Sequence, residues 1–385
     1  MHIFFEEEQM KKGMTWLAAM AFCVALTAPA LAADPIKIGV QGAHSGDLAS
    51  YGVPSLNATK IVVDEANTKG GVLDQNVEVI SQDDQCKPEM ATNAATKLIS
   101  DKVGVVVGPN CSGPTKAALP LFQEANLIAV SPTATTPALT EDGKNPLFFR
   151  TVANDNAQAK LTSDFMLNKL KTKKIAYLHD NGDYGKGFAD NNRVFMEKGG
   201  AETVLFEAVT PDAVDFSAVV RKLRRAKPDI VVFGGYQPVA SKLIQQMRRD
   251  RLTTPFIGPD GVKDETFLKM TGKDSEGVYA SYPKDTSTLP EYKKAREAHV
   301  KAYGSEPGFG YYNAYAAAQC LLAAIEKAGG TDTAKLKEAL RTNPVDTPLG
   351  KISFNEKGDA AGMALSIYQV KDGKFVELDH SITLQ

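Results

Sequence analysis

The stretch VGVVVGPNCSGPTKAALP, residues 103–120, changes character in its middle. Four valines make its first part an apolar run, a Gly-Pro pair stops that run, and a helix-like segment follows. A short run of β-branched residues that leads through a turn into a helix is typical of a parallel strand covered on both faces. Asn110, Cys111 and Ser112 occupy the turn, so the question is whether they react with a substrate or only bind one.

The same alternation of apolar runs and helical segments repeats along the chain and predicts an α/β protein. Apolar runs separated by helical segments occur twice over, as IKIGV, VEVISQD, VGVVVGP and LIAVSP before residue 156, and as KIAYLHD, ETVLFEAV, DIVVFGG and PFIGPD after it. We expect two doubly wound lobes, each built on its own parallel sheet. Two long helices, about 290–303 and 311–328, and the strand-like pieces KISF and ALSIYQV follow. Periodicity alone assigns this last part to neither lobe.

The N-terminal 32 residues resemble a secretory signal peptide. Lys11 and Lys12 follow Met10, an apolar segment covers residues 16–28, and Ala30-Leu31-Ala32 is a small-x-small cleavage site. The apolar segment is too short to span a bilayer, so we expect cleavage before Ala33, secretion from the cytoplasm and a translation start at Met10. An uncleaved anchor and a lipid-modified Cys23 are the less favoured alternatives.

Charge and cysteine content narrow the function of the remaining 353 residues. They carry 42 basic and 43 acidic residues, a balance that predicts no nucleic-acid or membrane-surface partner. Three cysteines remain, and an oxidising compartment favours one disulfide and one free thiol. Cys320 lies in an apolar helical segment, where a thiol behaves as a small hydrophobe, which leaves Cys86 to pair with Cys111.

The turns after the apolar runs carry the candidate site, because ligands of open α/β sheets bind beyond the carboxyl ends of the strands. Hydroxyls, phenols and a few aspartates dominate these turns, and Lys186 is their only basic residue. Ser112 lacks the flanking glycines of a hydrolase nucleophile turn, and no metal-ligand spacing occurs. We therefore expect a binding protein with no cofactor and no metal, and not an enzyme.

Eight sequence motifs, taken in order along the chain, resemble those of the periplasmic leucine/isoleucine/valine-binding proteins of ABC importers. The motifs are IKIGVQGAHSGDLASYG, DDQCKPEMA with GPNCSGPT, SPTATTPALT, YLHDNGDYGKG, FGGYQP with IGPDGV, and DTPLGKISFNEKGD. The resemblance implies a type I periplasmic binding protein, a monomer whose two lobes close on an amino acid and then meet a membrane permease. It also implies three crossings between lobes, with residues 33–152 and 284–360 in lobe I and residues 153–283 and 361–385 in lobe II.

The resemblance also implies which residues hold the ligand. The backbone N–H and hydroxyl of Ser112, at a helix start, would donate to the ligand carboxylate, with help from Thr135. The Thr133 carbonyl, the Thr135 hydroxyl and Asp260 would meet the ammonium. The full set of expected ligand-binding residues is Tyr51, Asn110, Ser112, Thr133, Ala134, Thr135, Tyr184, Tyr236 and Asp260, and the expected disulfide joins Cys86 to Cys111.

Each of these residues has a plainer interpretation. Ser112 is a common helix-capping residue, Asp260-Gly261 is a turn signal, and the tyrosines are ordinary packing residues. Family members also usually carry glutamate at Asp260, and Gly310 aligns with an aromatic that often closes the pocket. A roomier, more polar pocket for other neutral amino acids or small carboxylates, and a ligand-sensing role in place of delivery, are therefore the alternatives.

Overall fold

The computed structural model describes residues 34–383, so the expected signal peptide lies outside the described residues. Strands and helices alternate in it, and the strands form a five-stranded, a seven-stranded and a three-stranded sheet. Among the described residues, no helix is long and apolar enough to cross a membrane.

The first sheet is parallel throughout, with the strand order β2-β1-β3-β4-β5. Its strands are β1 (Ile36–Gly42), β2 (Val77–Asp83), β3 (Val105–Val107), β4 (Ile128–Ser131) and β5 (Phe148–Arg150). The apolar run that opened the sequence analysis is thus the central strand, β3. Val105 and Val107 face one side of the sheet and Val106 faces the other, and all three are buried. This burial on both faces explains why the run does not alternate with polar residues.

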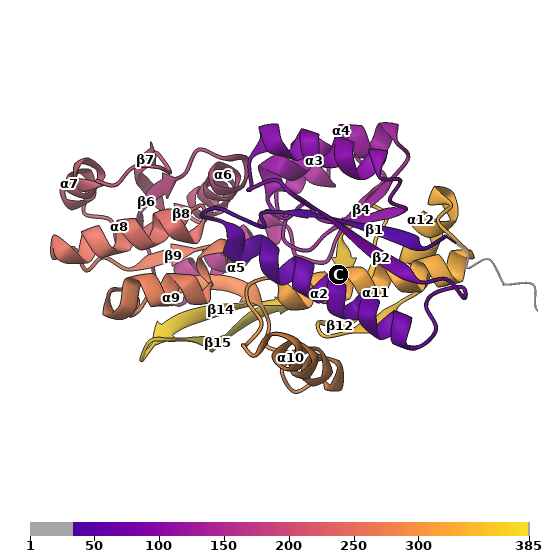
Figure 1. The fold of residues 1–385 in the computed structure, drawn as a ribbon. Helices are drawn as coiled ribbons and strands as arrows, with labels where there is room; N and C mark the ends of the chain where they lie inside the picture. Colours follow the sequence, from indigo (N-terminus) through magenta and orange to yellow (C-terminus); the bar gives the residue numbers. More distant parts are fainter. Residues whose placement is uncertain (1–33, 384–385) are drawn as a thin grey trace, which may run out of the picture. The chain divides into compact units, whose positions relative to one another are not determined.

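Helices cover both faces of this sheet (Figure 1). One face packs against α2 (Ala49–Thr68) and α11 (Tyr311–Ala328), and the other packs against α3 (Pro88–Ser100) and α4 (Ser112–Glu124). The two long helices expected late in the chain are α10 (Pro290–Tyr303) and α11. The other elements outside the second sheet and its helices are α12 (Thr333–Thr342), η1 (Pro137–Leu139) and the antiparallel strands β11 (Val345–Thr347), β12 (Gly350–Phe354) and β13 (Ala360–Ala361).

The second sheet has the order β15-β14-β10-β9-β8-β6-β7. Its parallel strands are β6 (Lys174–His179), β7 (Glu202–Ala208), β8 (Ile230–Gly234), β9 (Phe256–Gly258) and β10 (Tyr279–Pro283). The sheet is parallel, as predicted, except at one edge, where β14 (Ala364–Lys371) and β15 (Lys374–Thr383) add an antiparallel hairpin. The turn at Asp372-Gly373 is only two residues long, and such a short connection can join only antiparallel strands.

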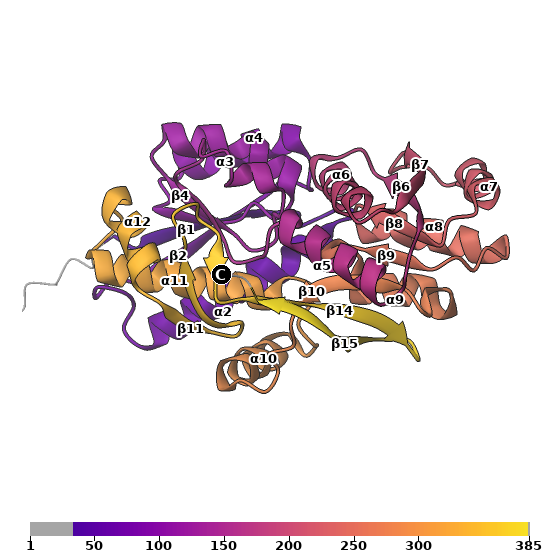
Figure 2. The ribbon, with the colours of Figure 1, turned by 180° about the vertical axis from the view of Figure 1, so that it is seen from behind.

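This sheet is also covered on both faces. One face packs against α5 (Asp155–Asn168) and α6 (Asp183–Lys198), and the other packs against α7 (Ser217–Ala226), α8 (Gln237–Arg249) and α9 (Glu265–Thr271). Seen from behind, α5 lies beside the β14–β15 hairpin (Figure 2). Two short 3₁₀ turns complete this part, η2 (Asp260–Val262) and η3 (Gly272–Ser275).

The chain passes between the two sheets after β5, after β10 and after β13. The first and third passages are bound together, because the Arg150 N–H donates to the Gly358 carbonyl at 2.9 Å and the Arg150 guanidinium pairs with Asp359 at 2.5 Å. The Arg150 side chain is fully buried. Two segments that are 209 residues apart in the sequence are therefore held at one point.

The structure contains the expected disulfide between Cys86 and Cys111 and places Cys320 as a buried free cysteine. The bridge joins the turn after β2 to the turn after β3, with a Cα–Cα distance of 5.6 Å. Cys111 directly precedes Ser112, so the disulfide fixes the entry of the chain into α4.

We predict that replacing both Cys86 and Cys111 by serine lowers the free energy of unfolding by about 3 kcal/mol, because the bridge closes a loop of 25 residues. Urea unfolding without reductant measures this change. Cys320→Ala, which removes the free thiol, is the control and should cost about 1 kcal/mol or less. An equal loss in the control, or three alkylated thiols in the unreduced mature protein, would contradict the prediction.

Candidate functional site

Turns from both sheets meet at one small cavity. Its lining includes six of the nine expected ligand-binding residues, namely Tyr51, Asn110, Thr133, Tyr184, Tyr236 and Asp260, together with Cys111, Gly261 and Phe309. The cavity has a volume of about 10 Å³. Tyr51 comes from the start of α2, Asn110 and Thr133 follow β3 and β4, and Tyr184, Tyr236 and Asp260 follow β6, β8 and β9. The carboxyl ends of parallel strands thus supply the site, as expected for such sheets.

Close backbone contact positions the two tyrosines of the second sheet. The N-terminal turn of α6 approaches the end of β8 so closely that a Cβ on Gly234 would lie 1.9 Å from the Gly185 carbonyl oxygen. Only glycine permits this approach. As a result Tyr184 and Tyr236 lie side by side, with ring centroids 5.0 Å apart.

Tyr51 connects the two sides of the cavity. Its hydroxyl donates to the Gly261 carbonyl at 2.5 Å and accepts the Gln237 N–H at 3.0 Å. Its ring packs edge-on against Tyr236 and Phe309, with centroids 5.4 and 4.7 Å away. Tyr51 is therefore a binding-site wall and also a direct link from α2 to η2 and α8.

Ser112 has a different role from a helix cap. Cys111 is the N-cap of α4, without a side-chain bond, and Ser112 is the first helical residue. The Ser112 hydroxyl oxygen accepts the backbone N–H groups of Thr135 and Thr136, both at 3.3 Å. The capping interpretation is therefore wrong, and the serine holds the neighbouring loop while its hydroxyl hydrogen stays available to a ligand.

Hydrogen bonds from the Arg150 guanidinium hold the loop after β4 in place. The guanidinium donates to the carbonyls of Ala134 and Thr136, at 3.2 and 2.9 Å, and to the Thr140 hydroxyl at 2.5 Å. The Thr133 hydroxyl donates to the Asn110 carbonyl at 2.7 Å. Ala134, Thr135 and Ser112 consequently lie next to the cavity but are not part of its lining.

Two buried carboxyl groups dominate the electrostatics of the site. Asp260 Oδ1 accepts the Tyr184 hydroxyl at 2.6 Å and the Gly261 N–H at 3.0 Å. Burial nevertheless raises the pKa of Asp260 to about 6. Asp155, at the first position of α5, is also fully buried, and burial followed by repulsion from Asp260 raises its pKa well above the usual range. Two such groups together favour a cationic ligand group over two separate negative charges.

Asp155 was missed by the sequence analysis, although its position gave a signal. It follows strand β5 just as the predicted residues follow their strands, and Asn154 caps its helix. Gln158 links the Asp155 carboxyl group to the backbone of Asp260, because its side chain donates to Asp155 Oδ1 at 3.3 Å and accepts the Asp260 N–H at 3.0 Å. Asp155 Oδ2 and the Thr135 hydroxyl make no hydrogen bond of ordinary length within the described part of the chain, but the hydroxyl lies close enough to lower the pKa of the Asp155 carboxyl group.

Phe309 is the second residue that the sequence analysis left out of the site. The alignment with Gly310 pointed to the neighbouring position, but Gly310 adopts a left-handed φ of 67° at the start of α11, and the aromatic ring before it lines the cavity. An aromatic wall is thus present, one residue earlier in the chain.

The cavity wall carries carboxyl, hydroxyl, amide and aromatic groups and one cysteine. Cys111 is bonded to Cys86 and has no free thiolate. Within residues 34–383, no group of three or more His, Cys, Asp or Glu side chains is arranged to hold a metal ion. The chemistry that the site offers is hydrogen bonding and charge complementarity.

The chain matches a family model described as "Periplasmic binding protein" over residues 35–374. It is 34% identical to the leucine-, isoleucine-, valine-, threonine- and alanine-binding protein of Pseudomonas aeruginosa, over 94% of this chain and 97% of the relative. Among solved structures, it resembles the branched-chain amino acid transporter substrate-binding protein of Streptococcus pneumoniae in complex with isoleucine. That match has a TM-score of 0.81 and 27% identity, over 90% of this chain and 100% of that one.

A second solved structure comes from Rhodopseudomonas palustris. It is a solute-binding protein of an ABC transporter in complex with 3,4-dihydroxybenzoic acid, with a TM-score of 0.80 and 26% identity over 91% of this chain and 98% of that one. The chain therefore belongs to the periplasmic binding protein family, and its fold is the two-lobed type I fold.

The raised pKa of Asp260 predicts how stability depends on pH. Since its folded-state pKa of about 6 exceeds the ordinary value of 3.8, the folded protein binds more protons than the unfolded chain between these values. Stability is then lost as the pH rises from about 4 to 6. Asp260→Asn should remove this penalty and raise the free energy of unfolding at pH 7 by about 3 kcal/mol.

Ligand-free protein unfolded in urea at pH 7 and at pH 3.5 measures this effect. The difference between Asp260→Asn and the parent protein should shrink at pH 3.5, where the carboxyl group is protonated in both states. Asp183→Asn, on the exposed Lys116–Asp183 pair, is the matched control. A variant that is less stable than the parent at pH 7 would contradict the raised pKa.

Proposed function

We propose that this protein is the solute-binding component of an ABC importer and binds branched-chain or other aliphatic neutral L-amino acids between its two lobes. The observation that carries the proposal is that one site contains two kinds of group. It has the buried carboxyl groups of Asp155 and Asp260, and it has hydroxyl and backbone donors at the start of α4. Such a site complements both charges of a zwitterion. The names of the relatives support the same ligand class.

The two ends of the site bind different groups of the ligand. The N-terminus of α4, with the Ser112 hydroxyl, takes the α-carboxylate, which the helix dipole favours. The Thr135 hydroxyl lies beside Asp155, so the ammonium binds there, facing Asp155 and Asp260. The rings of Tyr51, Tyr236 and Phe309 then cover the aliphatic side chain, since apolar ring faces suit it and the phenol hydroxyls keep their hydrogen bonds.

Binding is coupled to closure of two lobes, for which we propose the boundaries 33–152 with 284–360 and 153–283 with 361–385. The Tyr51–Gly261 bond and the Lys116–Asp183 ion pair, at 2.5 and 2.7 Å, join residues of the two lobes. A ligand that contacts both lobes favours the closed state because it gains those contacts only there. The closed form then docks on a membrane permease.

The cellular setting follows from the same proposal. The protein is exported by a cleaved signal peptide that ends at Ala32, works in the periplasm as a monomer, and uses no cofactor and no nucleic acid. It releases its ligand unchanged and is not an enzyme. Membership in a family of periplasmic binding proteins supports this setting.

A binder of small aromatic or other carboxylates is the second candidate. Asn110 and Thr133 make part of the cavity wall polar, and a relative of known structure holds 3,4-dihydroxybenzoic acid. Two buried carboxyl groups near the ligand oppose this candidate, since a carboxylate without an ammonium leaves them uncompensated. A ligand-sensing receptor role shares the same site and differs only in its partner.

We predict that aliphatic L-amino acids bind with micromolar or tighter affinity and that leucine binds about ten- to a hundredfold more tightly than alanine, since burying its side chain contributes about 1.5–3 kcal/mol. Calorimetric titration with all twenty amino acids, after unfolding to strip carried ligand, measures this. Solution scattering should show a smaller radius with leucine. Equal affinity for alanine, serine or a charged amino acid would contradict an apolar pocket, and binding of none would contradict the proposed function.

We also predict that Asp260→Asn weakens amino acid binding more than Ser112→Ala does. Neutralising Asp260 leaves the ammonium short of its counter-charge, a cost of about 3 kcal/mol, while Ser112→Ala keeps the backbone N–H and should cost about 1 kcal/mol. Titration of leucine into both variants gives the comparison. Small and equal losses would show that the ligand lies elsewhere or has no ammonium.

A further inference from the structure

A second and larger cavity lies on the other side of the turn η2. Its volume is about 320 Å³, at the lower end of the range of small-molecule pockets. Six aromatic side chains form much of its wall, namely Tyr282, Tyr292, Phe309, Tyr312, Tyr368 and Phe375. The hinge passage after β10 also lines it.

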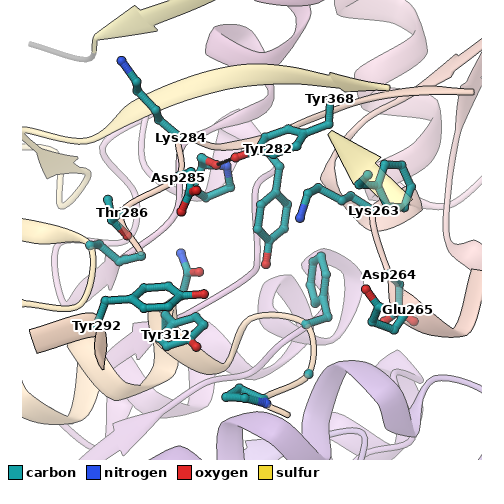
Figure 3. Close-up of a pocket in the computed structure, with 17 residues that line it drawn as sticks. Lys263, Asp264, Glu265, Tyr282, Lys284, Asp285, Thr286, Tyr292, Tyr312 and Tyr368 are labelled. Atoms are coloured by element: carbon teal, nitrogen blue, oxygen red, sulfur yellow. Dashed lines mark hydrogen bonds between the residues drawn. The ribbon is translucent and has the colours of Figure 1, made fainter. Parts of the chain in front are cut away.

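Lys263 and Lys284 both belong to the lining of this cavity, and Figure 3 shows the Lys263 amine directed toward the ring of Tyr282. The Nζ atom lies 4.1 Å from the ring centroid of Tyr282 and 4.6 Å from that of Tyr368. Among residues 34–383, no carboxylate lies within ion-pair distance of Lys263. The side chain is half-buried, and this desolvation lowers the pKa of Lys263 to about 8.

The nearby acids do not pair with Lys263, because they have other partners or lie toward solvent. Asp264 caps helix α9 by accepting the Thr266 N–H, and Asp285 accepts the N–H and hydroxyl of Ser287 at 2.8 and 3.0 Å. Glu265 is exposed, and Glu377 accepts the Asp285 N–H at 3.1 Å. The lysine charge is therefore compensated only by aromatic faces and by carboxylates at longer range.

Tyr282 adds a hydrogen-bond donor next to the cation. Its hydroxyl oxygen accepts the Gly310 N–H at 3.4 Å, and its own hydrogen has no acceptor in the described part of the chain. The Tyr368 hydroxyl, by contrast, is committed to the Pro283 carbonyl at 2.8 Å. One ammonium and one phenol hydrogen are thus available between flat apolar surfaces.

We propose that this hinge cavity is a second ligand site, for a small organic monoanion with a flat apolar body, such as an aromatic carboxylate. The Lys263 ammonium and the Tyr282 hydroxyl bind the carboxylate, and the surrounding rings cover the body of the molecule. A charge-assisted hydrogen bond is stronger than a bond between neutral groups, especially in a partly desolvated site. The site should therefore bind a carboxylate more tightly than the corresponding neutral amide.

The two cavities are coupled through shared elements. The turn η2 places Asp260 and Gly261 at the first cavity, and Lys263 directly after it points into the second. Phe309 lines both cavities. Because the hinge cavity takes its walls from residues on both sides of the β10 passage, an occupant stabilises the closed arrangement, and the two ligands then tighten each other's binding.

The test uses 4-fluorobenzoate as the probe and the mature protein, by fluorine NMR titration with and without saturating leucine. We expect binding that leucine strengthens, and at least about tenfold weaker binding of 4-fluorobenzamide. A probe affinity that leucine leaves unchanged would contradict the coupling of the two cavities. Lys263→Met should weaken probe binding about tenfold or more. Lys284→Met is the matched control, because Lys284 belongs to the same cavity rim but points away from it in Figure 3, and it should change binding by less than about twofold.

Tyr282→Phe is the second variant, and it should weaken the probe a few-fold even if Lys263→Met does not fold, as judged by circular dichroism. Probe binding that leucine displaces, or that depends on Ser112 and not on Lys263, would place the anion in the first cavity and overturn the proposal. Equal binding of the amide, or no binding at millimolar probe, would overturn it as well. The leucine titration is read separately, so failure here leaves the amino acid site untouched.

Discussion

The buried guanidinium of Arg150 is the interaction on which the rest of the site depends. It satisfies the carbonyls of Ala134 and Thr136 and pairs with Asp359, and none of its side chain is exposed. Taking such a charge out of water is costly unless its donors are matched, and here carbonyls, a hydroxyl and a carboxylate match them. One side chain thereby sets the loop that faces the ligand and ties the first passage between the sheets to the third.

The site next to this loop contains buried carboxyl groups, whose charge is matched less well than that of Arg150. Asp155 and Asp260 are buried without an ion-pair partner among residues 34–383, and the Arg150 charge lowers the pKa of Asp155 less than burial and Asp260 raise it. A site that holds unfavourable charge in its ligand-free form gains most when a cation arrives. Stability and binding therefore oppose each other at these two residues, as is common where function requires buried polar groups.

Local patterns were sufficient to predict most strands, most helices and the turns that carry the site. Val105 to Val107 form a strand because both faces of the first sheet are covered, and six of the nine predicted residues line one cavity because parallel strands end at the same edge. Asp155 and Phe309 were missed, since their roles depend on neighbours that are distant in the sequence. The antiparallel edge of the second sheet was missed because a strand's direction is decided by its partner.

The sequence by itself determined the α/β class, the order of elements and the pairing of Cys86 with Cys111, because these follow from hydrophobic periodicity, turn residues and the small number of cysteines. Only the tertiary structure decided that Tyr51 binds Gly261 and that Gln158 links the Asp155 carboxyl group to the Asp260 backbone. It also placed Lys263 among aromatic rings, without an ion-pair partner among residues 34–383. Such contacts join residues from separate elements. Their distances depend on how the sheets and helices pack, and packing is a property of the whole chain and not of any one segment.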